Sequence, residues 1–411
     1  MARHRRGKHG PSHRRVVLGG TVLGLVAGGA LVAAVAVPLP TGPPTLSLDV
    51  AARPPAVDPL DLPFPAHGES AVAVPSLGVT LAPGVQTPVP IASLTKMMTA
   101  YVALRALPLG PTDQGPSVTV TAADVKEYKR DVRTDQSSAL VAAGETLTER
   151  ELLDGMLVHS ANNFATLLAR LVAGDDTAMV NEMNLAATSL GLHRTTYADV
   201  SGVDPMSQSN AADQLRLAVL LMRNPTFAAI VKQTSVVLPV AGLVTTYTPY
   251  LGTKGVVGIK TGTTSESGGC VLMAYDANVG GRTVQVIAAV LGQRSTNLTL
   301  LQVAGRAALA LATGTAKRIT PWRVVTASRA VGTIGWPARN VPVVALHSIM
   351  VPTFPGAPAS SVVQVRTWST SYVGATQRLA TVVVVSGRYR YATPLVAAAT
   401  LTRPSLWQRL R

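Results

Sequence analysis

The chain has 411 residues and a mass of 42.6 kDa, which is longer than one ordinary domain and enough for two. Apolar residues make up 47% of it and charged residues only 14%, which excludes an intrinsically disordered protein, and its single cysteine excludes an intrachain disulfide. The formal charge of +15 is uneven: residues 1–15 carry six Lys and Arg, residues 277–411 carry fifteen, neither stretch has an acid, and residues 16–276 are left at −6.

The first predicted element is an apolar segment that follows the basic N-terminus. Residues 16–37 contain no charge and are long enough to cross the ~30 Å hydrocarbon core of a bilayer. Because residues 1–15 are basic, the positive-inside rule predicts a cytoplasmic tail, a transmembrane signal-anchor helix over 16–37, and an extracytoplasmic remainder. Ala34 and Ala36 also fit a signal cleavage site, so a secreted product stays open.

Residues 38–68 are rich in proline and follow the predicted anchor directly. They hold nine of the 29 prolines of the chain. Proline at this density disfavours both helices and sheet ladders, and it favours an extended, semi-rigid chain. This stretch is therefore predicted to be a linker that holds the folded part away from the bilayer.

The first pattern that carries chemistry lies where a helix is predicted to begin, near Ser93. Lys96 follows three residues later, so the two side chains share one face of the helix. A hydroxyl beside an amine suits nucleophilic catalysis, provided that burial or a second cation keeps the amine neutral. The same spacing is also typical of a helix start with a solvated lysine.

The second pattern is Ser160 and Asn162, which precede an amphipathic helical stretch. The hydroxyl can pass a proton, and the amide can both donate and accept hydrogen bonds. Both residue types are also ordinary helix caps, and Ser295 with Asn297 repeats the spacing.

The third pattern lies in a run of three predicted strands, over residues 256–263, 269–276 and onward to about 291. Lys260, Thr261 and Gly262 fall late in the first strand. There a small residue lets a ligand backbone approach, and a cation with hydroxyls can bind a carboxylate. The alternative is an edge-strand lysine that discourages aggregation.

In this order, S-x-x-K, S-x-N and K-T-G resemble the motif set of penicillin-binding proteins and serine β-lactamases. The segments ASLTKMMTA, HSANNFA and IKTGTTSESGGC are similar to those of low-molecular-mass penicillin-binding proteins that act as D-alanyl-D-alanine carboxypeptidases. The similarity covers roughly residues 66–295. It implies an α/β (α+β) catalytic domain over residues 69–315, with an antiparallel sheet flanked by helices.

The resemblance also implies catalytic roles. Ser93 would be acylated by the D-Ala-D-Ala end of a peptidoglycan stem peptide, and Lys96 would be its general base. Ser160 would relay a proton to the departing D-alanine. β-Lactams would acylate the same serine as inhibitors, and neither a metal nor another cofactor is implied.

The remaining motif residues would bind the substrate. Asn162 would hold the substrate's peptide amide. The K-T-G strand, with Lys260, Thr261, Gly262 and Thr263, would recognise the terminal carboxylate. The backbone N–H groups of Ser93 and Thr263 would form the oxyanion hole.

The sequence departs from the family pattern at two places, and the second bears on whether the protein is a β-lactamase. Asn210 stands where the family often has threonine before a helix, and it should still cap that helix. Glu182 and Leu185 give only a fragment of the glutamate motif that class A β-lactamases use, and helical spacing places this glutamate on a surface. A β-lactamase, a DD-endopeptidase with the same site, and a catalytically silent peptidoglycan-binding membrane protein stay open.

Beyond an alanine-rich helix over residues 298–312, short β-branched runs predict a basic, all-β domain over 318–411. Its arginine-only charge would suit anionic lipid head groups or anionic wall polymers, or it would simply be a solvated basic surface. Nucleic acid is not an expected partner of an exported chain.

Overall fold

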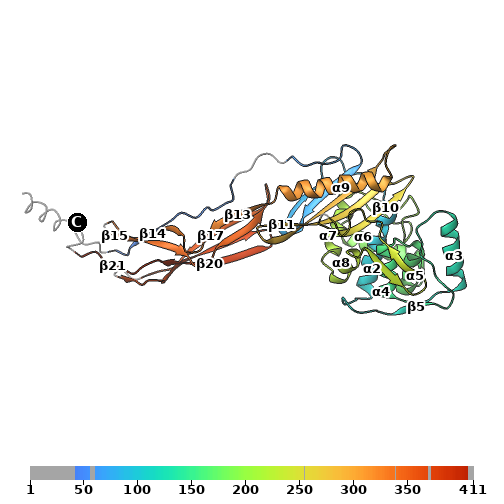
Figure 1. Cartoon of the computed structure of the whole chain (residues 1–411), viewed down its shortest axis with the longest axis horizontal. Helices are drawn as coiled ribbons and strands as arrows, with labels where there is room; N and C mark the ends of the chain where they lie inside the picture. Colours follow the sequence, from blue (N-terminus) through green and yellow to red (C-terminus); the bar gives the residue numbers. More distant parts are fainter. Residues whose placement is uncertain (1–41, 56–60, 254, 338, 369–371, 406–411) are drawn as a thin grey trace, which may run out of the picture.

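The computed structural model describes residues 42–55, 61–253, 255–337, 339–368 and 372–405. Together they form an elongated molecule, with a larger domain of helices and strands at one end and a narrower β domain at the other (Figure 1). The predicted membrane segment, residues 16–37, lies outside the described residues. Within the described ranges, no helix combines the length and the apolarity needed to cross a bilayer.

A five-stranded antiparallel sheet forms the centre of the larger domain. In spatial order its strands are β10 (Val256–Thr264), β11 (Gly268–Val279), β12 (Arg282–Gln293), β2 (Glu69–Val74) and β3 (Val79–Leu81). The three consecutive strands predicted over residues 256–291 are confirmed. Since β10 stands at the edge of the sheet, one side of it is free to face other elements.

Strand β2 shows why the sheet needs helices on both faces. Ala71 and Ala73 pack into the core below the main helical layer, whereas Val72 and Val74 pack into a second core under helix α9 (Leu300–Lys317). Successive side chains of a strand point to opposite faces, so this alternation places apolar groups on both. The predicted antiparallel sheet flanked by helices is confirmed.

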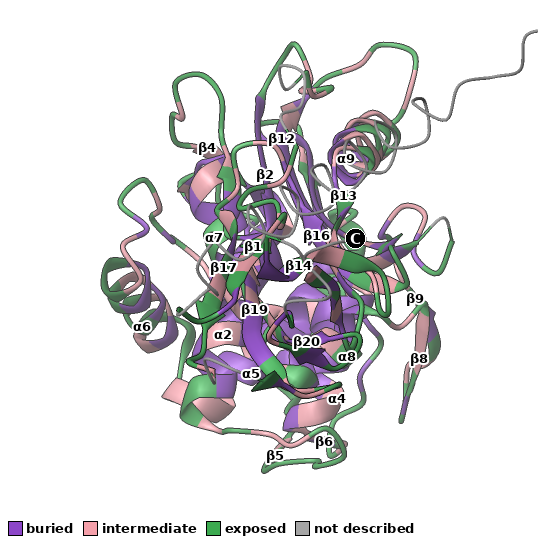
Figure 2. Cartoon of the chain, turned by 90° about the vertical axis from the view of Figure 1, so that its left-hand side faces the viewer, coloured by how far each residue is buried: buried purple, intermediate pink, exposed green. Residues whose placement is uncertain are grey.

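The main helical layer covers the opposite face from α9, and Figure 2 shows buried residues on its helices α2 and α5 as well as on the sheet. Its helices are α2 (Lys96–Ala106), α3 (Ala122–Arg133), α4 (Glu149–Val158), α5 (Asn162–Ala173), α6 (Asp176–Ser189), α7 (Ala211–Leu221) and α8 (Pro225–Val231). Asn210 caps α7, as expected, by accepting a hydrogen bond from Asp213 N at 2.8 Å. Three short strand pairs join the loops: β4 (Val89–Pro90) with β7 (Gln208–Ser209), β5 (Ser117–Thr119) with β6 (Thr146–Thr148), and β8 (Ser235–Leu238) with β9 (Gly242–Thr245).

The narrower domain is built on a six-stranded antiparallel sheet with its own apolar core. In spatial order the strands are β1 (Thr45–Leu48), β14 (Ala330–Trp336), β15 (Arg339–Ala345), β20 (Tyr389–Ala397), β19 (Arg378–Ser386) and β17 (Ala359–Val365). Two further pairs are β13 (Thr320–Val325) with β16 (Ile349–Thr353) and β18 (Tyr372–Val373) with β21 (Leu401–Thr402). The β-rich character expected from residue 318 onward is therefore present.

Strand β1 corrects the interpretation of residues 38–68 as a free linker. Thr45–Leu48 pair with β14, and the indole N–H groups of Trp336 and Trp368 donate to the carbonyls of Gly42 and Pro44, both at 3.1 Å. Proline is tolerated next to an edge strand, because an edge strand needs backbone hydrogen bonds on only one side. The N-terminal part of the described chain is thus an integral strand of the C-terminal domain.

A buried carboxylate lies at the start of α4. Glu149 is 0% exposed, and neither of its side-chain oxygens has a hydrogen-bond partner among the described residues. Gly115 lies directly against it, since a Cβ at that glycine would come within 2.5 Å of Glu149 Oε2. Burial raises the pKa of Glu149 to about 7.

Replacing Glu149 by glutamine is expected to stabilise the protein at pH 8 by about 1–3 kcal/mol and to change little at pH 4. The folded-state pKa of Glu149 lies above its ordinary value of 4.5, so the wild type loses stability as the pH rises through about 7. Urea unfolding at both pH values measures this, with the exposed Glu182→Gln as control. An equal gain at both pH values would contradict the explanation.

Candidate active site

Ser93 lies in a short 3-10 turn, η2 (Ala92–Thr95), and the α-helix α2 begins at Lys96. The helix predicted to start near Ser93 therefore starts three residues later. Ala92 holds a positive φ of 46°, a conformation that non-glycine residues adopt at a cost and that concentrates at functional sites. Ser93 is partly exposed while Lys96 is 0% exposed, so a reactant can reach the hydroxyl and the amine stays out of water.

Lys96 makes three hydrogen-bond contacts, which use all the donors of an ammonium group. Its Nζ lies 2.9 Å from Ser93 Oγ, 2.6 Å from Asn162 Oδ1 and 2.8 Å from the Ser201 carbonyl oxygen. A neutral amine has only two donors and one lone pair. Since the amide oxygen and the carbonyl can only accept, the lone pair of neutral Lys96 would face the Ser93 hydroxyl.

The second serine and lysine of the motif set form a matching pair. Lys260 Nζ donates to Ser160 Oγ at 2.8 Å and to the Thr261 carbonyl at 3.1 Å. Ser160 has a positive φ of 61° and immediately precedes the N-cap of α5, so its side chain is not a helix cap. The fold thus brings together two residues that are 100 positions apart in the chain.

Burial disfavours charge on both lysines, and repulsion from Lys260 adds to this effect at Lys96. Desolvation, and secondarily the nearby Lys260 cation, hold the pKa of Lys96 well below its usual value of 10.5. Desolvation lowers the pKa of Lys260 to about 7. A buried amine beside another cation is the environment in which lysine can act as a base near neutral pH.

Asn162 is oriented by residues that the sequence did not single out. Its Nδ2 donates to Gln136 Oε1 at 3.1 Å, and its backbone N–H donates to the Ser137 carbonyl at 2.8 Å. These contacts fix which way the amide points, with its oxygen toward Lys96. Gln136 lies outside the three motifs, so no sequence signal marked it.

The K-T-G strand β10 passes very close to the Ser93 backbone. A Cβ at Gly262 would lie 2.7 Å from Ser93 N and 3.0 Å from the Ile91 carbonyl oxygen, so only glycine fits here. Thr261 is buried and Thr263 is exposed. The glycine thus lets β10 approach the turn that carries Ser93, and Thr263 is the next residue of the strand.

A loop after α6 completes the surroundings of Lys96. Asp199 accepts hydrogen bonds from Ser201 Oγ at 2.9 Å, from the Gly202 and Val203 backbone N–H groups at 2.8 Å, and from Ser207 Oγ at 2.6 Å. This holds the Ser201 carbonyl against the lysine. No pattern in the sequence revealed that Asp199 organises this loop.

Replacing Asp199 by alanine is expected to lower the acylation rate of Ser93 by about 10–100-fold, because the loop that supplies one acceptor to Lys96 loses its anchor. Stopped-flow acylation by a β-lactam measures the rate, and Asp199→Asn should retain more of it than alanine does. Asp204→Ala, in the same loop, is the control. A rate unchanged by Asp199→Ala would show that the loop holds without this carboxylate.

Three other residues considered in the sequence lie outside this group of serine, lysine and asparagine side chains. Ser295 Oγ accepts from the backbone N–H groups of Asn297 and Leu298, at 3.2 and 3.0 Å, and so forms a local turn. Glu182 is exposed on α6, as its helical spacing predicted. Cys270 is buried, and burial raises its pKa to about 11, so it is no nucleophile.

A partly exposed serine touching a buried, pKa-depressed lysine, with a second serine–lysine pair behind it, is an arrangement that suits nucleophilic catalysis by a serine. Residues 78–295 match the family described as D-alanyl-D-alanine carboxypeptidase, which is more than half of the chain. The protein belongs to this family. The match falls within the predicted catalytic domain and contains all three motifs.

Individual relatives agree with the family assignment. The chain is 35% identical over 153 residues to the D-alanyl-D-alanine carboxypeptidase DacB2 of Mycobacterium tuberculosis, covering 36% of this chain and 48% of that protein. It is 31% identical to a D-alanyl-D-alanine carboxypeptidase of a Streptomyces species, covering 47% of this chain and 69% of that one. The first match thus spans about half the length of that relative.

A solved structure supports the fold over both domains. The crystal structure of a peptidoglycan synthesis regulatory factor (PBP3) from Streptococcus pneumoniae superposes with a TM-score of 0.58 at 20% identity. It covers 83% of this chain and all of that one. The predicted fold of a penicillin-binding protein is therefore confirmed.

Proposed function

We propose that this protein is a serine D-alanyl-D-alanine carboxypeptidase that removes the terminal D-Ala from peptidoglycan stem pentapeptides through an acyl-enzyme. The observation that carries the proposal is the 2.9 Å contact between Ser93 Oγ and Lys96 Nζ, with Lys96 buried and its pKa depressed. Membership of the carboxypeptidase family supports the same reaction.

In the acylation step, neutral Lys96 takes the proton of Ser93 while Ser93 Oγ attacks the carbonyl carbon of the penultimate D-Ala. The negative charge that develops on the carbonyl oxygen would be met by the backbone N–H groups of Ser93 and Thr263. As the C–N bond breaks, Ser160, held by Lys260, passes a proton to the amide nitrogen and receives the proton of Lys96 in turn, which leaves Lys96 neutral for the next step. Free D-Ala leaves, and an ester to Ser93 remains.

In the deacylation step, water attacks the ester carbonyl and Lys96 accepts a proton from it. Collapse of the second tetrahedral intermediate returns the proton to Ser93 Oγ and releases the shortened peptide. The same groups therefore act in reverse order, and no external co-reactant besides water is required.

Strand β10 provides the substrate-binding edge in this proposal. The Lys260 cation and the hydroxyls of Thr261 and Thr263 would bind the terminal carboxylate, because a charge-assisted hydrogen bond to a carboxylate is strong in a buried site. Asn162 would hold the peptide amide. An extended peptide can add to the free side of an edge strand such as β10.

Release of free D-Ala from a stem pentapeptide, and stoichiometric labelling by a fluorescent penicillin, test the proposal. A DD-endopeptidase would instead cleave cross-linked dimers faster than pentapeptide, and a β-lactamase would turn over the penicillin instead of keeping it. A silent binding protein would show neither D-Ala release nor label. An unlabelled, properly folded wild type would overturn the enzyme assignment.

We also propose that the catalytic domain works outside the cytoplasm, tethered by residues 16–37 at the plasma membrane or secreted after cleavage. The basic residues ahead of this apolar segment support that orientation. Fractionation of cells, followed by N-terminal sequencing of the mature protein, would distinguish the anchored form from the secreted form.

A further inference from the structure

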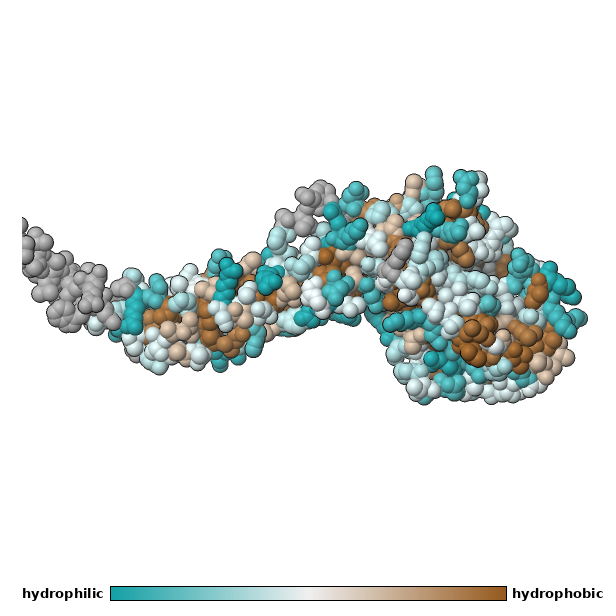
Figure 3. Space-filling view, in the orientation of Figure 1, coloured by the Kyte–Doolittle hydropathy of each residue, from teal (hydrophilic) through white to brown (hydrophobic). Residues whose placement is uncertain are grey.

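A cavity of about 680 Å³ lies where the two domains meet, and none of the motif residues lines it. Its walls come from the turn η1 (Pro75–Leu77), the end of α7, the β11–β12 hairpin and the turn between β19 and β20. In space-filling view the molecule narrows between the domains (Figure 3). A volume of this size is typical of small-molecule sites.

The C-terminal domain contributes one residue to the lining of this cavity, the exposed Arg388, and the backbone of Arg388 is held in place. The Arg388 backbone N–H donates to the Ser76 carbonyl at 2.8 Å. The preceding Gly387 has a positive φ of 53°, and a Cβ there would lie only 2.2 Å from the same carbonyl oxygen. The turn between β19 and β20 therefore packs closely against η1, and this contact fixes the position of the Arg388 backbone.

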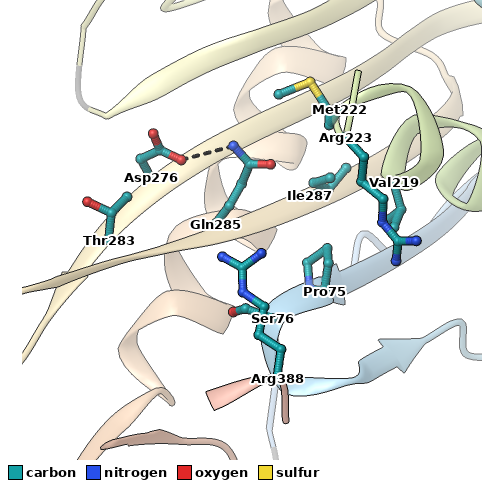
Figure 4. Close-up of a pocket in the computed structure, with 10 residues that line it drawn as sticks. All are labelled: Pro75, Ser76, Val219, Met222, Arg223, Asp276, Thr283, Gln285, Ile287 and Arg388. Carbon is teal, nitrogen blue, oxygen red and sulfur yellow. Dashed lines mark hydrogen bonds between the residues drawn. The ribbon is translucent and has the colours of Figure 1, made fainter. Parts of the chain in front are cut away.

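The cavity carries an excess of positive charge. Arg223 and Arg388 line it, and neither guanidinium has an ion pair within the part of the chain that the structure describes. The one acid in the lining, Asp276, already accepts a hydrogen bond from Gln285 Nε2 at 3.1 Å. Figure 4 shows Asp276 turned toward Gln285, with the Arg388 guanidinium below Gln285 and the Arg223 guanidinium at the right beside Val219.

An unsatisfied hydroxyl adds a second, independent sign of a ligand. Ser76 lines the cavity and is 5% exposed, yet its Oγ has no hydrogen-bond partner among the described residues. Buried polar groups without a partner are rare in folded proteins and call for a missing ligand or water. The Ser76 Oγ is almost fully enclosed, so a rotation of its side chain would let it donate to an anionic oxygen bound by Arg388.

We propose that this interdomain cavity binds a small ligand through an oxyanion, a phosphate or a carboxylate, with Arg388 as the main contact and Ser76 and Arg223 as supporting ones. A guanidinium matches both groups because its planar N–H donors pair with two oxygens at once. Since the walls come from both domains, a bound ligand would also tie the domains together. None of the residues proposed for catalysis lines the cavity, so the site would act separately from Ser93.

The test uses the purified chain and two probes, inorganic phosphate and the carboxylate of N-acetylmuramic acid, each titrated against chloride at equal ionic strength. Calorimetry and the melting temperature report binding. Arg388→Gln should weaken binding about tenfold or more, whereas Arg390→Gln should not, because Arg390 is equally exposed on the same hairpin but does not line the cavity. Penicillin labelling of Ser93 should stay unchanged in both variants, which confirms that they are folded.

Each outcome decides the proposal. Saturable binding of either probe that is lost in Arg388→Gln supports it, and the probe that binds more tightly identifies phosphate or carboxylate as the ligand group. If Arg388→Gln fails to fold, Arg223→Gln and Ser76→Ala must both weaken binding. No saturable binding by the wild type, or equal binding by the Arg388 and Arg390 variants, overturns the proposal and leaves the carboxypeptidase assignment untouched.

Discussion

Replacing Ser93 by alanine is expected to abolish covalent labelling by penicillin and to lower D-Ala release by ~10⁴-fold or more, as loss of a nucleophile does in other serine enzymes. Among the serines that the structure describes, only Ser93 combines partial exposure with a side-chain contact to the buried Lys96 amine. The fold should be retained, because alanine fills the same turn without a new steric demand. Intact-protein mass spectrometry after penicillin treatment, together with a D-Ala assay, measures both effects.

The matched control for this experiment is Ser360→Ala. Ser360 is an exposed serine on β17 in the other domain, so its removal should leave both labelling and turnover at wild-type levels. A penicillin adduct that persists in Ser93→Ala and maps to another residue would show that the nucleophile has been wrongly identified.

Replacing Lys96 by methionine is expected to lower the acylation rate by ~10²–10⁴-fold, the usual contribution of a general base. Methionine keeps much of the buried volume but can neither accept the Ser93 proton nor hydrogen-bond to Asn162 and the Ser201 carbonyl. The rate of penicillin adduct formation measures the loss. Lys317→Met, an exposed lysine at the end of α9, removes the same charge elsewhere and should have no effect.

The pH dependence of kcat/KM shows whether Lys96→Met removes the catalytic base or only distorts the site. Lys96 acts unprotonated, so kcat/KM of the wild type should rise with pH as Lys96 loses its proton. Lys260 binds the substrate carboxylate as a cation, so kcat/KM should fall again above about pH 7, where free Lys260 becomes neutral. Lys96→Met should lose the acidic limb. An acidic limb that remains in this variant would exclude Lys96 as the base.

Much of the local structure followed from residue patterns. Apolar spacing predicted the strands β10 to β12. The three-residue separation predicted that Ser93 and Lys96 would meet, which they do although Ser93 lies in the 3-10 turn before α2. The Ser160–Lys260 contact could not be predicted from spacing, because the two residues lie on elements 100 positions apart and only the family resemblance linked them. Gln136 and Asp199 went unnoticed, since their roles depend on loops that carry no periodicity.

The pairing of the proline-rich segment, residues 38–68, also could not be predicted from the sequence. Its composition indicated an extended chain, which is what β1 is, but not that Thr45–Leu48 would pair with β14 almost three hundred residues later. The partner of a strand depends on which sheet edge is free in the folded protein. The residues of the strand itself do not specify that partner.

The amino-acid sequence by itself determined which groups are available for chemistry here: a serine and lysine one turn apart, a serine and asparagine ahead of a helix, and a lysine on a glycine-containing strand. Tertiary structure decided what those groups can do. An amine becomes a base only when other segments exclude water from it and bring a second cation near, and desolvation of Lys96 and Lys260 comes from residues drawn from the whole catalytic domain.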